Sequence, residues 1–196
     1  MRSLTCAALA AAMFVAAMSV GAMPSRADTL HDRLPACLAC HGEKGQSATA
    51  NTPSLGAQLQ GYVLIQLYMF REKLRKVEIM NQMAEGLTDD DLRAFAEAIA
   101  KLPAPPAVAD VGDTARIARA KDLVAKNRCN FCHTPSFAGQ DQVPRIAGQR
   151  EDYLLKTLRE YKSNTRYGYD AAMAAVVEPM QDQDFVDLAY YLARVK

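Results

Sequence analysis

The spacing of apolar residues predicts helices that occur in two similar sets along the 196-residue chain. Apolar residues recur at i, i+3, i+4 and i+7 in residues 92–99 and again in residues 185–192, the spacing of one face of an α-helix. Thr88 and Asp91 resemble a capping box at the start of the first of these helices. The expected fold class is all-α. Middle helices are expected at residues 58–73 and 151–162, and leading helices at residues 28–34 and 114–126.

The two sets of helices are copies of one unit. Residues 53–58 match residues 144–149 at an offset of 91, and residues 87–92 match residues 180–185 at an offset of 93. Self-similarity of this kind indicates a duplicated unit with small insertions. A proline-rich segment between the copies predicts a stiff, extended linker. The expected domains are residues 28–102 and 113–196, joined by a linker at residues 103–112.

The first residues read as an export signal rather than as part of the fold. Arg2 gives a positive start, residues 4–20 are apolar, and the small residues around Arg26 offer a cleavage site after Ala27, with cleavage after Ala22 as an alternative. We therefore expect residues 1–27 to be a cleaved signal peptide and the mature protein to be periplasmic. No later stretch approaches the roughly 20 apolar residues of a spanning helix, so the protein is not expected to span a membrane.

The four cysteines that remain after this segment occur as two copies of the motif C-x-x-C-H, which marks c-type haem attachment. Two thiols three positions apart on a turn of helix can each form a thioether to a haem vinyl group, and the next imidazole then falls under the iron. We expect two haem c groups, one per domain. The predicted attachment residues are Cys37, Cys40, Cys129 and Cys132, and the predicted iron ligands in these motifs are His41 and His133.

Three other interpretations of the cysteine pairs are weaker. A thioredoxin-like redox pair needs a βαβ context, and no strand-like alternation surrounds the motifs. A zinc site built from two such pairs usually has them close in sequence, whereas Cys40 and Cys129 are 89 positions apart. Disulfides within a C-x-x-C motif are strained and leave the two adjacent histidines unexplained.

The repeat also selects a second ligand for each iron, because that ligand should occupy the same place in both copies. At the offset of 93, Met80 coincides with Met173. The remaining candidates, Met69, Met83 and Met180, have no methionine counterpart and are expected to fill gaps in the core. We therefore predict Met80 and Met173 as the distal iron ligands.

With these residues in place, the chain resembles the two-domain, di-haem class I cytochromes c of the c-four type. The resemblance rests on the two C-x-x-C-H motifs, the Pro-x-(Leu/Ile)-x-x-Gln turns that begin at Pro53 and Pro144, and the spacing of the methionines. It implies two tandem all-α domains that face one another, each wrapped around one haem. It also implies that the carbonyls of Pro53 and Pro144 hold the proximal imidazoles. The short leading segment of the first domain departs from the pattern, as does Thr134 where Gly42 stands in the first copy.

A histidine and a methionine on one iron leave no open position, and a thioether ligand favours the ferrous state. We therefore expect an electron-transfer protein and not an enzyme; a di-haem peroxidase would need an iron that can open to its substrate. The leading hypothesis is a carrier between a quinol-oxidising complex or dehydrogenase and a terminal oxidase. The alternative is the electron-accepting cytochrome subunit of a periplasmic dehydrogenase complex.

The expected partners are redox proteins. The chain carries 23 basic and 22 acidic residues, which gives no footprint for nucleic acid. One basic cluster precedes Met80 and has two interpretations: a docking site for an acidic partner, or an ordinary solvated helix end. This cluster consists of Arg71, Lys73, Arg75 and Lys76.

Overall fold

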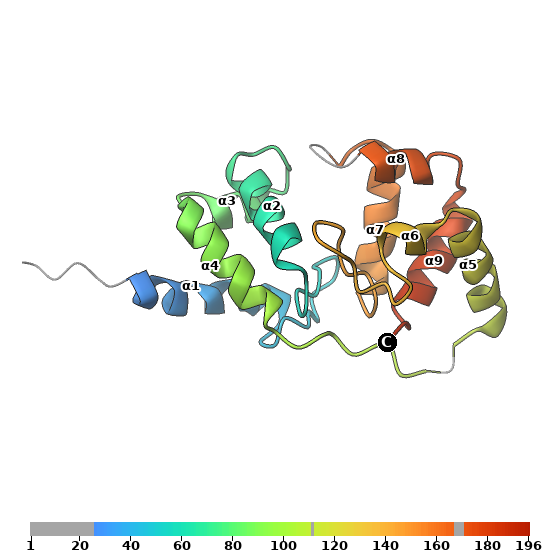
Figure 1. The fold of residues 1–196 in the computed structure, drawn as a ribbon, viewed down its shortest axis with the longest axis horizontal. Helices are drawn as coiled ribbons and strands as arrows, with labels where there is room; N and C mark the ends of the chain where they lie inside the picture. Colours follow the sequence, from blue (N-terminus) through green and yellow to red (C-terminus); the bar gives the residue numbers. More distant parts are fainter. Residues whose placement is uncertain (1–25, 111, 167–170) are drawn as a thin grey trace, which may run out of the picture.

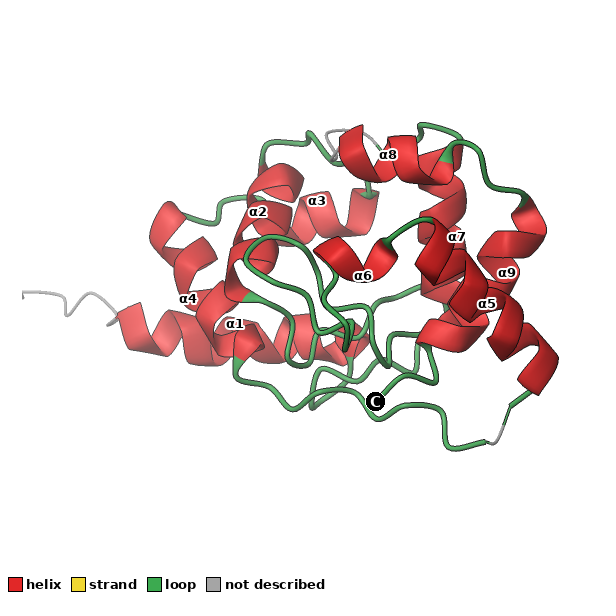
Figure 2. Cartoon of the chain, turned by 45° about the vertical axis from the view of Figure 1, so that its right-hand side comes forward, coloured by secondary structure: helices red, strands yellow, loops and turns green. Residues whose placement is uncertain are grey.

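The computed structural model describes residues 26–110, 112–166 and 171–196, with side chains from Arg33 onward (Figure 1). The predicted signal peptide lies outside these residues except for Arg26 and Ala27, which begin the first helix. All regular elements in the described part are α-helices, as expected (Figure 2). The only β-bridge in that part is an isolated antiparallel one between Gln140 and Val143. The first half contains α1 (Arg26–His41), α2 (Gln60–Arg71), α3 (Glu78–Ala84) and α4 (Asp89–Ala100); the second contains α5 (Thr114–Lys126), α6 (Cys129–Cys132), α7 (Glu151–Lys162), α8 (Ala171–Val177) and α9 (Asp182–Leu192).

The helix that leads into the first motif differs from the expected short segment. α1 continues through Pro35 to His41, so the whole C-x-x-C-H motif belongs to one helix. In the second half, α5 ends at Lys126, and Arg128 adopts a left-handed conformation (φ 53°) that separates it from α6. α5 and α7 have the bounds that the sequence predicted, residues 114–126 and 151–162. α3 and α8 were not predicted, because seven residues are too few to show a helical period.

The two halves bury their cores to different extents. Among the described residues, the second half has one continuous cluster of buried apolar side chains that joins α5, α7 and α9. Ala120 and Ala189 are fully buried there, and their small side chains let α5 and α9 approach closely. The first half has two smaller clusters, one around Phe95 and one around Ile99, mainly from α2 and α4. The second half therefore has the more extensive protein core.

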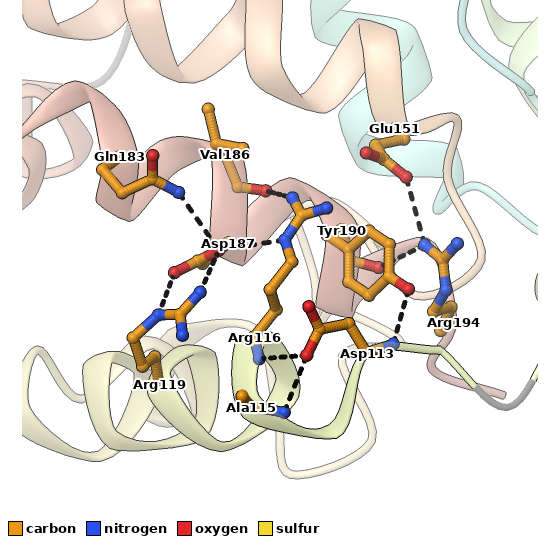
Figure 3. Close-up of polar contacts among 10 residues, drawn as sticks. All are labelled: Asp113, Ala115, Arg116, Arg119, Glu151, Gln183, Val186, Asp187, Tyr190 and Arg194. Carbon is orange, nitrogen blue, oxygen red and sulfur yellow. Dashed lines mark hydrogen bonds and ion pairs between the residues drawn. The ribbon is translucent and has the colours of Figure 1, made fainter.

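A buried carboxylate forms hydrogen bonds between α5 and α9 where the two helices cross (Figure 3). Asp187 on α9 is 2% exposed and accepts hydrogen bonds from Arg116 Nε at 3.1 Å and Arg119 Nε at 2.6 Å, both on α5. Gln183 donates a further bond from the preceding turn of α9 at 3.3 Å. Buried carboxylates need such partners, because an unpaired one would pay a large desolvation cost. Asp187 therefore ties the first helix of this half to the last.

The corresponding crossing in the first half has no such residue. The repeat places Ala94 at the position of Asp187. Across this crossing Arg33 lies 3.5 Å from Asp91, and its guanidinium is 5.6 Å from the centre of the Phe95 ring. Leu34 adds an apolar contact to both clusters of this half. α1 and α4 thus meet, but through partly exposed groups.

The segment between the halves is bonded to both of them. Near its start, Gln46 Nε2 donates to Ala104 O at 3.3 Å, and near its end Val108 N–H donates to Ala193 O at 3.0 Å. Pro105 is buried between these points, and a side chain at Gly56 would come within 2.0 Å of Pro103 O. In Figure 1 this segment runs along one edge of the molecule below both groups of helices. In the part of the chain that the structure describes, no helix has the length and apolar character needed to cross a bilayer.

Candidate haem sites

The cysteines of each motif lie on one helix with a similar arrangement of exposure. The first cysteine of each pair, Cys37 or Cys129, is partly buried, and the second, Cys40 or Cys132, is exposed. Burial raises the pKa of the Cys37 and Cys129 thiols. None of the four is paired as a disulfide. Each half therefore presents two cysteines at the spacing that two thioether bonds to one haem need.

The histidines that follow are buried and oriented in the same way. Nδ1 of His41 lies 2.8 Å from Pro53 O, and Nδ1 of His133 lies 2.9 Å from Pro144 O. A carbonyl can only accept, so Nδ1 carries the proton and Nε2 is left with its lone pair. Burial lowers the pKa of both imidazoles, and this outweighs the opposing effect of the proline carbonyls. Each ring is therefore held neutral, in the tautomer that can bind a metal through Nε2.

The structure places Met80 and Met173 at matching positions. Each is the third residue of a seven-residue helix, α3 or α8, and each is partly buried against the core of its own half. Met69 and Met180 are buried, 5% and 4% exposed, in agreement with a core role. The prediction was wrong for Met83, which is 38% exposed.

The loops that follow the two motifs meet between the groups of helices, as both cartoon views show (Figures 1 and 2). Ser54 N–H donates to Gln149 Oε1 at 2.8 Å, and Gln149 Nε2 donates back to Ser54 O at 2.9 Å. Arg145 N–H donates to Gln58 Oε1 at 2.8 Å, and Gln58 Nε2 donates to Arg145 O at 3.1 Å. The repeat aligns Ser54 with Arg145 and Gln58 with Gln149, so the interface is pseudo-symmetric.

A second group of polar residues crosses the interface beside these loops. Arg75 and Arg166 are equivalent in the repeat, and both are buried, 8% and 7% exposed. Their guanidinium groups lie 3.3 and 3.4 Å from the hydroxyl of Tyr153. Burial opposes ionisation of Tyr153, but the two guanidinium charges outweigh it and lower the pKa of this phenol to about 7. The interface thus holds buried cationic donors from both halves.

Arg75 corrects both interpretations of the basic cluster. Its guanidinium is buried and also donates to Gln66 Oε1 at 2.6 Å, so it is neither solvated nor available to an external partner. Arg71 pairs with Asp89 at 2.7 Å. Of the four, Lys73 and Lys76 remain exposed.

Sequence reasoning did not assign a role to the polar residues of the interface. The signal was present, because Gln58 and Gln149 recur at the offset of 91, and so do Arg75 and Arg166. When a polar residue that is not an expected ligand recurs in both copies, its repetition indicates a structural or functional role. Here that role is contact with the other half, which the sequence of a single half does not show.

Comparisons with known proteins found a family model, curated relatives and a solved structure that are similar to this chain. A family model described as Cytochrome c matches residues 117–196. Cytochrome c4 of Thiocapsa roseopersicina is 30% identical over 80% of this chain and 85% of its own, and the thiosulfate dehydrogenase electron acceptor of Stutzerimonas stutzeri (strain A1501) is 31% identical over 82% of this chain and 79% of its own. The crystal structure of reduced recombinant cytochrome c4 from Pseudomonas stutzeri has a TM-score of 0.77 at 25% identity and covers 87% of this chain and 98% of that one.

The helical fold and the two haem-attachment motifs define the class: this is a c-type cytochrome with two haem c groups, an electron-transfer protein. Within that class, the chain belongs to the cytochrome c4 family.

Proposed function

We propose that the protein carries single electrons in the periplasm, from a quinol-oxidising complex or a dehydrogenase to a terminal oxidase or another acceptor. The observation that carries the proposal is the matched pair of neutral, oriented imidazoles at His41 and His133. Each haem c, when bound, supplies one-electron iron chemistry. The residues around it hold the iron in one coordination state, so an electron can pass with little rearrangement.

The residues present fit this cofactor. We assign covalent attachment to Cys37 and Cys40 in the first half and to Cys129 and Cys132 in the second. His41 and His133 are the proximal ligands, Met80 and Met173 the distal ligands, and the carbonyls of Pro53 and Pro144 fix the imidazoles. Haem c also carries two propionates, and buried carboxylates require charged donors. Arg75 and Arg166 supply charged donors of that kind at the interface.

A redox titration followed in the visible spectrum tests this function. We expect low-spin haems, a methionine–iron band at the red end of the spectrum from both sites, and two one-electron steps. Met80→Ala and Met173→Ala should each remove that band from one haem and lower one potential, because the thioether favours ferrous iron. A high-spin ferric protein that binds cyanide rapidly would contradict the proposal and support a di-haem enzyme.

The second candidate is the electron-accepting cytochrome of a periplasmic dehydrogenase complex. It is favoured by the relative from Stutzerimonas stutzeri that is described as a thiosulfate dehydrogenase electron acceptor. Purification from the native cell separates the two candidates. A partner that remains stoichiometric in high salt supports the complex subunit, whereas a cytochrome that elutes alone and reduces an oxidase supports the free carrier.

We further propose that residues 1–27 are removed during export and that the mature chain consists of domains 28–102 and 113–196 with the linker at 103–112. The sequence features of the signal and the proline-rich linker support this division. The N-terminal sequence of protein recovered from the periplasm tests it. We expect the sequence to begin at Asp28, and retention of the apolar segment would contradict it.

A further inference from the structure

We propose that Gln58 and Gln149 are positioning residues that couple the two haem sites. Each glutamine holds and polarises, across the interface, the peptide group to which the proximal histidine of the other half is hydrogen-bonded. The inference rests on the proposed role of His41 and His133 as iron ligands. It adds a specific chemical route by which the docking of one half sets the reduction potential of the other.

The route begins at one peptide group in the first half, the bond between Pro53 and Ser54. Its carbonyl accepts the Nδ1 proton of His41 at 2.8 Å. Its N–H donates to Oε1 of Gln149, from the second half, at 2.8 Å. One planar peptide unit therefore links the imidazole of one half to the carboxamide of the other.

The same route runs in the opposite direction from the second half. The carbonyl of Pro144 accepts the Nδ1 proton of His133 at 2.9 Å, and the N–H of the same peptide group, at Arg145, donates to Gln58 Oε1 at 2.8 Å. The two contacts are related by the repeat. A single fortuitous contact would not recur on the equivalent peptide, and this one does.

Local bonds fix the orientation of both carboxamides. Gln149 Oε1 also accepts from Arg150 N–H at 3.0 Å, and Gln58 Oε1 accepts from Leu59 N–H at 3.1 Å. Each Oε1 thus faces two N–H donors, which excludes the flipped amide. The glutamines are 7% and 6% exposed, so water competes little for these bonds.

The expected direction follows from hydrogen-bond cooperativity. When a peptide N–H donates, its carbonyl gains electron density and becomes a better acceptor, by about 10–30% per bond in condensed-phase estimates. A stronger acceptor at Nδ1 makes the imidazole a more basic ligand. A more basic ligand favours ferric iron and lowers the reduction potential. Each glutamine should therefore lower the potential of the haem in the opposite half.

Gln149→Leu and Gln58→Leu test the proposal in the intact di-haem protein. Gln149→Leu should raise the potential of the haem held by His41, and Gln58→Leu should raise that of the haem held by His133. The separation of the two potentials should thus change in opposite senses in the two variants. We expect the equilibrium constant for sharing one electron between the haems to change about threefold to tenfold, where tenfold corresponds to about 59 mV.

A spectroscopic readout places each effect on one histidine. The chain has three histidines, so the Nδ1–H signals of His41 and His133 can be followed in reduced, ¹⁵N-histidine-labelled protein. Gln149→Leu should move the His41 signal and leave that of His133 in place, with the reverse for Gln58→Leu. If each variant instead moves the signal of its own half, or neither signal, the proposal is wrong.

Asp152→Ala is the control for weakened docking, because alanine removes the oxygen acceptor that asparagine would keep. Asp152 accepts a hydrogen bond from Asn51 N–H across the interface at 2.9 Å, but it contacts neither peptide group of the route. It should leave the separation of the potentials nearly unchanged. If this variant reproduces the shifts of the leucine variants, general loosening of the interface explains them and the proposal fails.

Gln149→Glu provides a second test, which is needed if Gln149→Leu separates the two halves. A glutamate at this position retains an oxygen acceptor for Ser54 N–H, so the His41 signal and potential should move opposite to their change in Gln149→Leu, or stay at the wild-type values. A shift in the same direction as leucine would overturn the proposal. Wild-type haems that are high-spin or redox-inactive would instead refute the proposed function itself.

Discussion

The two halves repeat one sequence unit, yet they hold their first and last helices together in different ways. In the second half, α5 and α9 cross over buried alanines and around the buried carboxylate of Asp187. In the first half, Ala94 stands at that position, and α1 reaches α4 mainly through Arg33 and Leu34. The protein part of the second half is therefore better connected, and the first half should depend more on its haem.

Loss of one haem should have the largest effect and should distinguish the halves. The double variant Cys37→Ala, Cys40→Ala cannot attach haem, and its first half should unfold. The expected loss in the free energy of unfolding is about 5 kcal/mol or more, which is the whole net stability of a small domain. Cys129→Ala with Cys132→Ala should leave residual pairing of α5 with α9. Hydrogen exchange resolved by peptide checks this. Equal protection of α1 and α5 in the two haem-free halves would refute the comparison.

Asp187→Asn should have the next largest effect, confined to the second half. Neutralising the carboxylate leaves Arg116 and Arg119 without their charged acceptor at the crossing. We expect a loss of about 2 kcal/mol in the free energy of unfolding. The loss is no larger because Arg119 is half exposed, so that water can solvate its guanidinium once the charged acceptor is gone. Arg33→Gln in the first half is the matched control and should cost under about 1 kcal/mol. Denaturant unfolding of both variants measures the difference, and equal losses would contradict it.

The same carboxylate should make the second half more sensitive to acid. The hydrogen bond from Arg119 lowers the pKa of Asp187, and this outweighs the opposing effect of burial. The pKa of Asp187 is lower in the folded protein than in the unfolded chain, where it is about 3.9. The ionised carboxylate therefore contributes its full stabilisation at pH values above the unfolded-state pKa, and this contribution is lost as the pH falls through the folded-state pKa. The unfolding free energy of the second half should therefore fall more steeply below about pH 4. Asp187→Asn should flatten this slope; an unchanged slope would exclude Asp187 as its source.

The smallest effect concerns the starts of the two last helices. Thr88 Oγ1 accepts from Asp91 N–H at 3.2 Å, and Asp91 accepts from Thr88 N–H at 2.8 Å. Thr88→Ala should cost about 1 kcal/mol. In the second half, the backbone N–H of Gln181 donates to Asp184 at 2.8 Å, and a substitution to alanine retains that bond. Gln181→Ala should cost only a few tenths of a kcal/mol. Thermal unfolding of both variants tests the ranking.

The parts of the fold that could be predicted are those with local causes. The capping box at Thr88 and the apolar period of α7 depend on neighbours in the sequence, and both were found at the expected residues. The haem motifs could also be found, because thioether attachment demands a fixed local spacing. α3 and α8 could not, since each is shorter than the window in which a period can be recognised.

The contacts across the interface could not be predicted for a different reason. Arg75 follows a helix end, next to exposed lysines, and nothing local distinguishes it from them. Its guanidinium contacts Gln66 and Phe70 of its own half and also Tyr153 of the other half. Gln58 and Gln149 likewise reach the peptide groups at Arg145 and Ser54 only when the two halves meet. The repeat shows that these residues are shared by both copies, but the orientation of the copies comes from the three-dimensional structure.

The linker that is bonded at both ends has a consequence for how the halves stay together. A short linker joins the halves covalently, and its residues 104 and 108 are bonded to opposite halves, so each half meets the other at a high effective concentration, in the millimolar range for short connections. An interface made of a few polar contacts can then remain closed although the same contacts between separate chains would dissociate. Cutting the chain within residues 103–107 should turn closure into a concentration-dependent equilibrium. Dilution would then open an interface that the intact chain keeps shut.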